Sequence, residues 1–147
     1  MFFFEDQGWE KHQAAAIVAQ GMWESGGNHS DQIITTAHGD KDEKQSAHGG
    51  WQWRGDRYSG PQGLLSFTLT HCPGHSSAEP IVQYRFVQWE LAEGPEKRAG
   101  RLLRAAQGVE EATKAFIGYL RPRGFTWDAP ELGHGYEKRL ELAQSLM

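Results

Sequence analysis

The spacing of apolar residues predicts a helix over residues 7–24. One face of this helix collects four small or apolar side chains at the i, i+3, i+4 and i+7 positions, which are Ala14, Ile17, Val18 and Gly21. The Gly26-Gly27 pair then supplies a stop signal. Because Glu24 follows Ile17 by two helical turns, its carboxyl group is expected on the same face, near the end of the helix.

The helical period is lost over residues 28–54, where Gly, His, Asp and Thr accumulate. Within this part, the β-branched run over residues 33–36 predicts one strand of a small hairpin. Helical patterns resume after Gly60-Pro61, and Ser76 and Glu79 have the spacing of a capping box. The predicted later helices cover residues 64–67, 81–91, 96–106, 109–120 and 136–146, with a loop over 121–135.

These elements predict an α+β fold that is mainly α, with several helices and a small β-hairpin element. The chain has 147 residues, and neither an internal repeat nor a shift in composition calls for a second domain. We therefore expect residues 1–147 to form a single domain. A hydrophobic content of 38% with six tryptophans is too apolar for a disordered chain.

The charge balance and the N-terminal sequence exclude several classes of protein. The chain has 15 Lys and Arg against 19 Asp and Glu, so it lacks the basic excess of a typical nucleic-acid-binding protein, and we expect no nucleic acid as partner. Residues 1–6 include acidic residues where a signal peptide has basic ones. No stretch approaches about 18 apolar residues. We expect neither a signal peptide nor a membrane span.

Three short segments carry the most informative pattern. A helix that ends in Glu-Ser-Gly is followed by Gly-Asp and then by a glycine-rich block with Gln-Trp-Arg, at residues 22–28, 38–40 and 46–54. This order resembles the phage tail lysozyme family. Four blocks carry the resemblance, namely residues 14–28, 39–57, 83–91 and 139–143.

The resemblance implies a lysozyme-like fold and cleavage of the glycan strands of bacterial peptidoglycan. It also implies a phage or prophage source, in which the chain is a tail domain or a free endolysin. Phage tail components are then expected partners. The location implied is the virion, or the cytoplasm until delivery to the cell wall or periplasm.

When the family's functional residues are matched by position to this chain, the resemblance implies four site residues. Glu24 matches the catalytic acid, Asp40 matches the acid of the Gly-Asp element, Ser46 lies where related enzymes have a hydroxyl residue, and Gln52 borders the sugar groove. The chain departs from the family pattern in the insertion-like run over residues 41–45. Other acids therefore compete with Asp40 for the role of second carboxylate, and these are Asp31, Asp42 and Glu43.

The chemistry of glycoside cleavage supports Glu24 independently. A glycosidic oxygen is a poor leaving group, so a carboxylic acid must protonate it as the bond breaks. Burial beside Trp23 and the negative end of the helix dipole would both raise the pKa of Glu24. The alternative is a surface glutamate in the last helical turn. For Asp40 the alternative is an ordinary loop acid, because Gly-Asp is also a common turn pair.

The tryptophan-rich block suggests a sugar-binding surface. Trp51, Trp53 and Arg54 could line a sugar groove, because apolar sugar faces stack on indoles. Strand alternation would place Trp51 and Trp53 on one side and Gln52 on the other, with core packing as the alternative for either tryptophan. His48 is close in sequence to the proposed second carboxylate and could contact sugar.

A metal centre is the remaining chemical possibility. His71, Cys72 and His75 offer three ligands within five residues, but this spacing completes no standard zinc pattern. Cys72 is the only cysteine, which excludes an intramolecular disulfide. We expect neither a metal nor a cofactor.

The sequence thus predicts a lysozyme, or muramidase, that hydrolyses the β-1,4 bond between N-acetylmuramic acid and N-acetylglucosamine. Three alternatives remain. A lytic transglycosylase would use Glu24 without a second carboxylate and would form anhydro-muramyl ends. A tail or wall-binding protein with the same fold would be non-catalytic. A metal-dependent hydrolase would depend on His71, Cys72 and His75.

Overall fold

The computed structural model describes residues 1–26, 32–39 and 46–147. The fold is 59% helix and 4% strand, which confirms the predicted mainly α class. Its strands form a three-stranded antiparallel sheet in the order β1-β2-β3. Within these three ranges, no helix combines the length and the apolar character that a membrane crossing needs.

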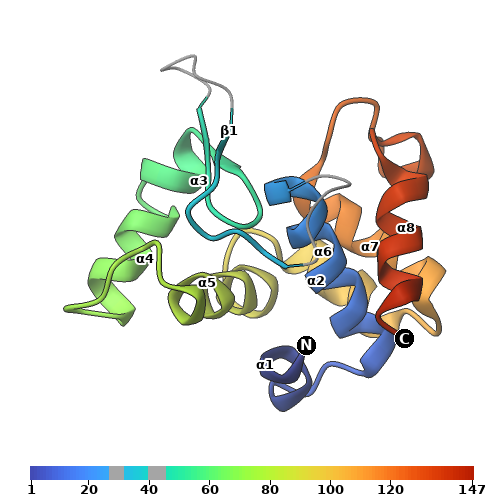
Figure 1. Cartoon of the computed structure of the whole chain (residues 1–147), viewed down its shortest axis with the longest axis horizontal. Helices are drawn as coiled ribbons and strands as arrows, with labels where there is room; N and C mark the ends of the chain where they lie inside the picture. Colours follow the sequence, from blue (N-terminus) through green and yellow to red (C-terminus); the bar gives the residue numbers. More distant parts are fainter. Residues whose placement is uncertain (27–31, 40–45) are drawn as a thin grey trace.

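The helices and strands are arranged in two groups (Figure 1). The small sheet lies with α3 and α4 in one group, whereas α2, α7 and α8 pack together in the other. The strands are β1 (His38–Gly39), β2 (Ala47–His48) and β3 (Trp53–Arg54). The helices are α1 (Phe2–Asp6), α2 (Lys11–Gly26), α3 (Asp56–Ser59), α4 (Leu64–His71), α5 (Pro80–Ala92), α6 (Lys97–Ala105), α7 (Val109–Leu120), the 3₁₀ helix η2 (Pro130–Leu132) and α8 (Tyr136–Ser145).

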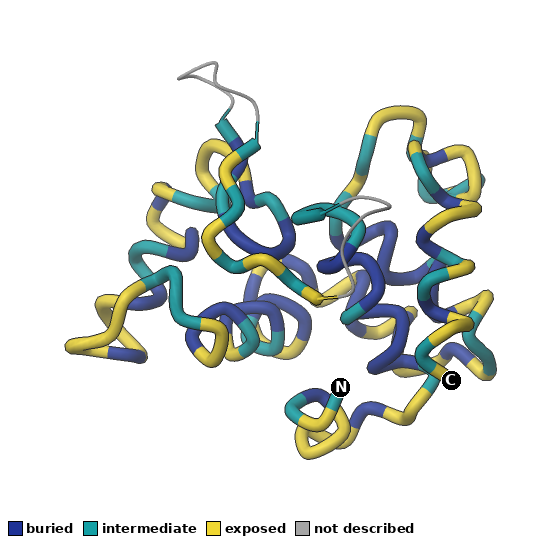
Figure 2. The backbone as a smooth tube through the Cα atoms, in the orientation of Figure 1, coloured by how far each residue is buried: buried dark blue, intermediate teal, exposed yellow. Residues whose placement is uncertain are grey.

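Helix α2 is central and is buried around most of its circumference (Figure 2). Its small side chains allow α7 and α8 to pack directly against it. The sequence predicted one apolar stripe, but buried side chains extend well beyond that stripe and include Gln13, Ala15, Ala16, Ala19, Gln20 and Met22. The helix begins at Lys11 rather than at residue 7, because Gly8, at φ +90°, separates it from α1.

The predicted strand over residues 33–36 is wrong, and the first strand instead covers His38–Gly39. The reason is the side chain of Gln83 on α5, which is buried. Its Nε2 atom donates to the carbonyl oxygen of Thr35 at 2.9 Å, and its Oε1 accepts from the amide of Gly50 at 2.9 Å. A side chain therefore satisfies backbone groups that a neighbouring strand would otherwise pair.

The later helices follow the predicted pattern closely. Helix α7 coincides with the predicted range 109–120, and α5, α6 and α8 differ from theirs by one residue at one or both ends. Helix α4 continues to His71, beyond the predicted residues 64–67. The capping-box prediction is wrong in position, because α5 has Glu79 as its N-cap. Glu79 still accepts a hydrogen bond from the amide of Ser76 at 2.6 Å.

Candidate active site

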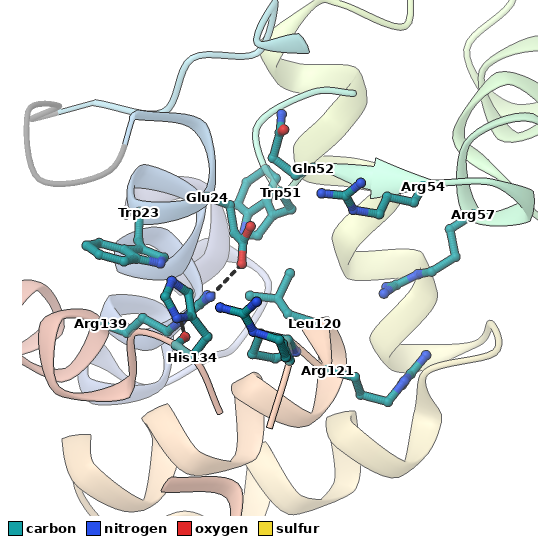
Figure 3. Close-up of a pocket in the computed structure, with 12 residues that line it drawn as sticks. Trp23, Glu24, Trp51, Gln52, Arg54, Arg57, Leu120, Arg121, His134 and Arg139 are labelled. Carbon is teal, nitrogen blue, oxygen red and sulfur yellow. Dashed lines mark hydrogen bonds and ion pairs between the residues drawn. The ribbon is translucent and has the colours of Figure 1, made fainter. Parts of the chain in front are cut away.

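A pocket of about 710 Å³ lies where the end of α2, the β2–β3 turn and the segment between α7 and α8 meet (Figure 3). Glu24 enters it from α2, and Gln52 and Arg54 enter it from the turn and β3. The lining residues are Trp23, Glu24, Trp51, Gln52, Arg54, Arg57, Leu120, Arg121, Pro122, Arg123, His134 and Arg139.

Glu24 is fixed in this pocket by an ion pair with Arg139 of α8. Its Oε1 atom lies 2.7 Å from Nη2 of Arg139, and the Glu24 side chain is 21% exposed whereas that of Arg139 is 2% exposed. The Nε atom of Arg139 also donates to the carbonyl oxygen of His134 at 3.0 Å. Because two separate groups hold the guanidinium, the Glu24 carboxylate has a defined position at the pocket wall.

The surroundings of Glu24 differ from the apolar environment that its helix face suggested. Trp23 is half-buried and lines the pocket near Glu24, but the group in direct contact with the carboxylate is a buried cation. Burial lowers the pKa of Arg139, and the charge of Glu24 opposes this effect. Arg139 was not among the predicted site residues, although it lies within one of the blocks that carry the family resemblance.

The turn between β2 and β3 places Trp51 and Gln52 at the pocket. The indole Nε1 of Trp51 donates to the carbonyl oxygen of Ile17 at 3.0 Å, which ties the turn to α2. This close approach requires Gly21, because a Cβ atom there would lie 2.7 Å from the Trp51 ring. Gln52 has a φ of +56°, a left-handed conformation that is uncommon for a residue other than glycine. Its Nε2 donates to the carbonyl oxygen of Gly49 at 2.8 Å.

The predicted substrate contacts separate into two groups. Trp51, Gln52 and Arg54 line the pocket. Trp53 does not line it, and its indole donates to the Tyr119 hydroxyl at 2.9 Å in the core. This corrects the expectation that Trp53 contacts sugar and makes it a core residue. Trp51 is equally buried, so its ring lies behind the pocket wall.

His48 lies in β2 and Ser46 immediately precedes this strand, and neither residue lines the Glu24 pocket. The ring of His48 stacks between those of His38 and Tyr58, with centroid separations of 4.5 and 3.8 Å. The Ser46 hydroxyl is hydrogen-bonded to Nε2 of His48 at 3.1 Å. His48 instead borders a second pocket, of about 200 Å³.

The predicted second carboxylate, Asp40, lies outside the described residues, as do its alternatives Asp31, Asp42 and Glu43. The residue before Asp40 is Gly39, at the end of β1. Gly39 packs so closely against the side chain of Gln52 that a Cβ atom on Gly39 would clash with it. Strand β1 therefore ends beside a residue that lines the Glu24 pocket.

The family model described as phage tail lysozyme matches residues 1–147, the whole chain. The chain belongs to the phage tail lysozyme family. Neither a curated protein nor a solved structure matches it significantly. Membership in the phage tail lysozyme family supports a lytic enzyme that acts on peptidoglycan in a phage context.

The pocket of this member of the phage tail lysozyme family is strongly basic. Among its lining residues, Glu24 faces five arginines, which are Arg54, Arg57, Arg121, Arg123 and Arg139. The whole chain, in contrast, has a formal net charge of −4. Positive charge is therefore concentrated at this pocket, a feature that the overall composition did not predict.

The cluster considered for a metal offers no such site. Among the residues that the structure describes, no three His, Cys, Asp or Glu side chains form a group that could hold a metal ion. Cys72 is buried in the hydrophobic core, and His75 instead contacts Glu79, with 3.2 Å between Nδ1 and Oε1. The alternative of a metal-dependent hydrolase built on His71, Cys72 and His75 therefore has no structural support.

Proposed function

We propose that residues 1–147 form a single lysozyme-like catalytic domain that hydrolyses bacterial peptidoglycan. The bond cleaved is the β-1,4 linkage between N-acetylmuramic acid and N-acetylglucosamine. The position of Glu24 carries this proposal, because it ends the central helix at the wall of a large pocket and is held there by Arg139. The phage tail lysozyme family supplies the substrate class.

In the proposed reaction, Glu24 is the general acid. Its Oε1 atom contacts Arg139, so Oε2 carries the proton and transfers it to the glycosidic oxygen as the bond from that oxygen to the anomeric carbon breaks. The carboxylate that remains is stabilised by the adjacent guanidinium. Water then forms the new bond to the anomeric carbon and gives up a proton to a carboxylate.

The second carboxylate in this scheme is Asp40, with Asp31, Asp42 and Glu43 as the other candidates. It either activates the water or stabilises the oxocarbenium-like centre until water adds. The place of Gly39 beside Gln52 supports Asp40, because Gln52 lines the pocket. We further propose that Gln52 and Arg54 contact the sugars, with Trp51 packed behind them, and that Ser46 and His48 lie outside this set of contacts.

The proposal is tested by replacing Glu24 with glutamine. The amide keeps the shape of the side chain but cannot donate the proton that the leaving oxygen needs, so Glu24→Gln is expected to lower the rate of wall lysis by at least about 100-fold. The rate is measured as loss of turbidity of purified cell walls, after circular dichroism has shown that the variant is folded.

The matched control is Glu5→Gln, which makes the same chemical change at an exposed residue of α1. This variant is expected to retain the wild-type rate. If Glu24→Gln lyses walls at more than a tenth of the wild-type rate, Glu24 is not the catalytic acid. If the folded wild type lyses no walls under any condition, the chain is a non-catalytic member of the family.

A further inference from the structure

We infer that the basic side of the pocket, formed by Arg123 and His134 next to the Glu24–Arg139 pair, is a subsite for a carboxylate carried by the muramyl unit of the substrate. This inference rests on the proposed function and extends it. It assigns to one side of the cleft the recognition of a charged substituent rather than of the sugar ring itself.

Most of the cationic side chains at the pocket are already used within the fold. Arg121 makes a two-point contact with Glu96, with Nη1 to Oε2 at 2.6 Å and Nη2 to Oε1 at 2.8 Å. Arg57 donates through Nη2 to Glu90 at 3.2 Å. These two arginines neutralise acids behind the pocket, and their removal would leave buried carboxylates unpaired.

Arg123 differs from them because it is exposed and its guanidinium has no hydrogen-bond or ion-pair partner in the part of the chain that the structure describes. Its backbone is nevertheless anchored, since its carbonyl oxygen accepts from the amide of His134 at 2.8 Å. Both residues line the same pocket as Glu24. A fixed backbone thus presents a guanidinium with its donors available to a ligand.

Arg139 adds positive charge beneath this subsite. Its Nη2 and Nε atoms have acceptors, but Nη1 is buried and has no hydrogen-bond partner among the described residues. The single carboxylate of Glu24 therefore does not satisfy all the donors of this guanidinium. A buried cationic donor without an acceptor raises the free energy of the folded protein, so binding of a negatively charged group at the adjacent rim is favoured.

The chemistry of the basic rim selects a carboxylate. A neutral sugar needs planar hydrogen-bonding groups, which Gln52 already offers at the pocket wall. A guanidinium matches a carboxylate in both charge and geometry. In peptidoglycan, free carboxylates are carried by the stem peptide of the muramyl residue, and by its lactyl group where the stem peptide has been removed. Recognition at Arg123 would thus orient the muramyl unit relative to Glu24.

The test compares Arg123→Gln with Arg101→Gln, which makes the same charge change at an exposed residue of α6. Three substrates are used, namely peptidoglycan fragments with intact stem peptides, the same fragments with carboxylates capped by glycinamide, and amidase-stripped glycan strands that carry the lactyl carboxylate. For intact fragments, Arg123→Gln is expected to raise KM by about 10-fold with kcat changed less than about twofold. Arg101→Gln is expected to match the wild type.

Capping is expected to raise the KM of the wild type by a similar factor and to leave that of Arg123→Gln nearly unchanged. The lactyl carboxylate is free only in the stripped strands. A high KM for these strands shows that the subsite takes only a stem-peptide carboxylate, whereas a low KM shows that it also takes a carboxylate attached directly to the sugar. An unchanged KM for Arg123→Gln on intact fragments, or an equal effect of capping on both proteins, would overturn the inference.

Calorimetry separates this inference from the proposed function. In a Glu24→Gln background, binding of intact fragments should weaken by about 10-fold when Arg123→Gln is added. This loss is expected whether or not Glu24 is the catalytic acid, because it depends on the charge of the ligand. If the Arg123 substitution leaves binding unchanged in that background, the subsite is absent even if Glu24 proves essential for lysis.

Discussion

The Glu24–Arg139 pair joins the end of α2 to α8, near the C-terminus of the chain. The sequence predicted Glu24 from the family resemblance, with support from the position of its carboxyl group at the end of an apolar helix face. It did not predict the partner, since nothing local connects the two helices. A signal was present, however, because Arg139 lies on the buried face of α8 with Tyr136 and Ala143. A cation at such a position requires a partner.

This contact predicts that Arg139→Lys impairs lysis although it conserves the charge. A single ammonium group cannot reproduce the planar guanidinium that bonds both the Glu24 carboxylate and the carbonyl oxygen of His134. The misplaced carboxylate is expected to lower the initial lysis rate by about 10- to 100-fold. The rate is measured at equal concentrations of folded protein, and Arg101→Lys, at an exposed site, should behave as the wild type.

The two neighbouring tryptophans show where residue patterns mislead. Strand alternation predicted that Trp51 and Trp53 share one side opposite Gln52. In the structure, Trp51 and Gln52 belong to a turn, and Gln52 has a positive φ. Both tryptophans are buried, but Trp51 lies at the pocket and Trp53 beneath Tyr119. The pattern indicated large aromatic groups at this place without distinguishing their roles.

At the scale of secondary-structure elements, the longer helices were predictable, whereas the short helices α1 and α3 and the strands were not. The stripe of apolar residues over 109–120 is long enough to define α7, and Gly108 precedes its first residue. Strands of two residues contain too few positions for an alternating pattern. Their pairing depends on tertiary contacts, such as that of Gln83 with Thr35 and Gly50.

The sheet contains a stack of rings that predicts a pH dependence of stability. Burial, and then the charge of His38, lower the pKa of His48 from its ordinary value of 6.5. The folded state therefore favours neutral His48, and between the lowered pKa and pH 6.5 the unfolded chain binds more protons than the folded chain. Stability contributed by His48 is present above pH 6.5 and is lost as the pH falls through the lowered pKa of the folded state.

Urea denaturation at about pH 7 and about pH 5 measures this effect. The wild type is expected to lose more of its free energy of unfolding on acidification than a His48→Gln variant does. His38→Gln removes one of the two causes, so it should show an intermediate loss. Equal losses for the wild type and His48→Gln would show that the stacked histidine does not couple folding to protonation.

At the scale of the whole molecule, a buried polar network connects the two groups of elements behind the cleft. Glu90 of α5 accepts from Arg57 of α3 at 3.2 Å and from the hydroxyl of Tyr119 on α7 at 2.5 Å. Burial raises the pKa of Tyr119 well above its usual value, so this hydroxyl keeps its proton and donates it. The network joins the sheet side of the molecule to the helical side.

Glu90→Leu is therefore expected to lower the free energy of unfolding by about 3–5 kcal/mol, because it removes the acceptor of the buried Tyr119 hydroxyl and one acceptor of the half-buried Arg57 guanidinium. The measurement is urea denaturation followed by circular dichroism. Glu93→Leu replaces an exposed glutamate just beyond the end of the same helix and should change the free energy by less than about 0.5 kcal/mol. Similar values for the two variants would show that the network contributes little.

The distribution of charge is likewise a property of the whole molecule. Composition correctly gave a net negative chain, but it could not reveal that arginines from β3, α3, α8 and the segment after α7 meet at one pocket. These residues are far apart in the sequence and are brought together by the packing of α2 with α7 and α8. Knowledge of the fold was therefore required to locate the basic cleft.

The central claim, hydrolysis of the glycan strand by Glu24 with a second carboxylate, is tested most directly by mass spectrometry of digested cell walls. Hydrolysis adds water to the anomeric carbon, so the products should be muropeptides with reducing N-acetylmuramic acid ends. Each product is one water heavier than the anhydro form that a lytic transglycosylase would release. Predominantly anhydro-muramyl ends would contradict hydrolysis, and cleaved stem peptides with intact glycan strands would contradict the role of Glu24 altogether.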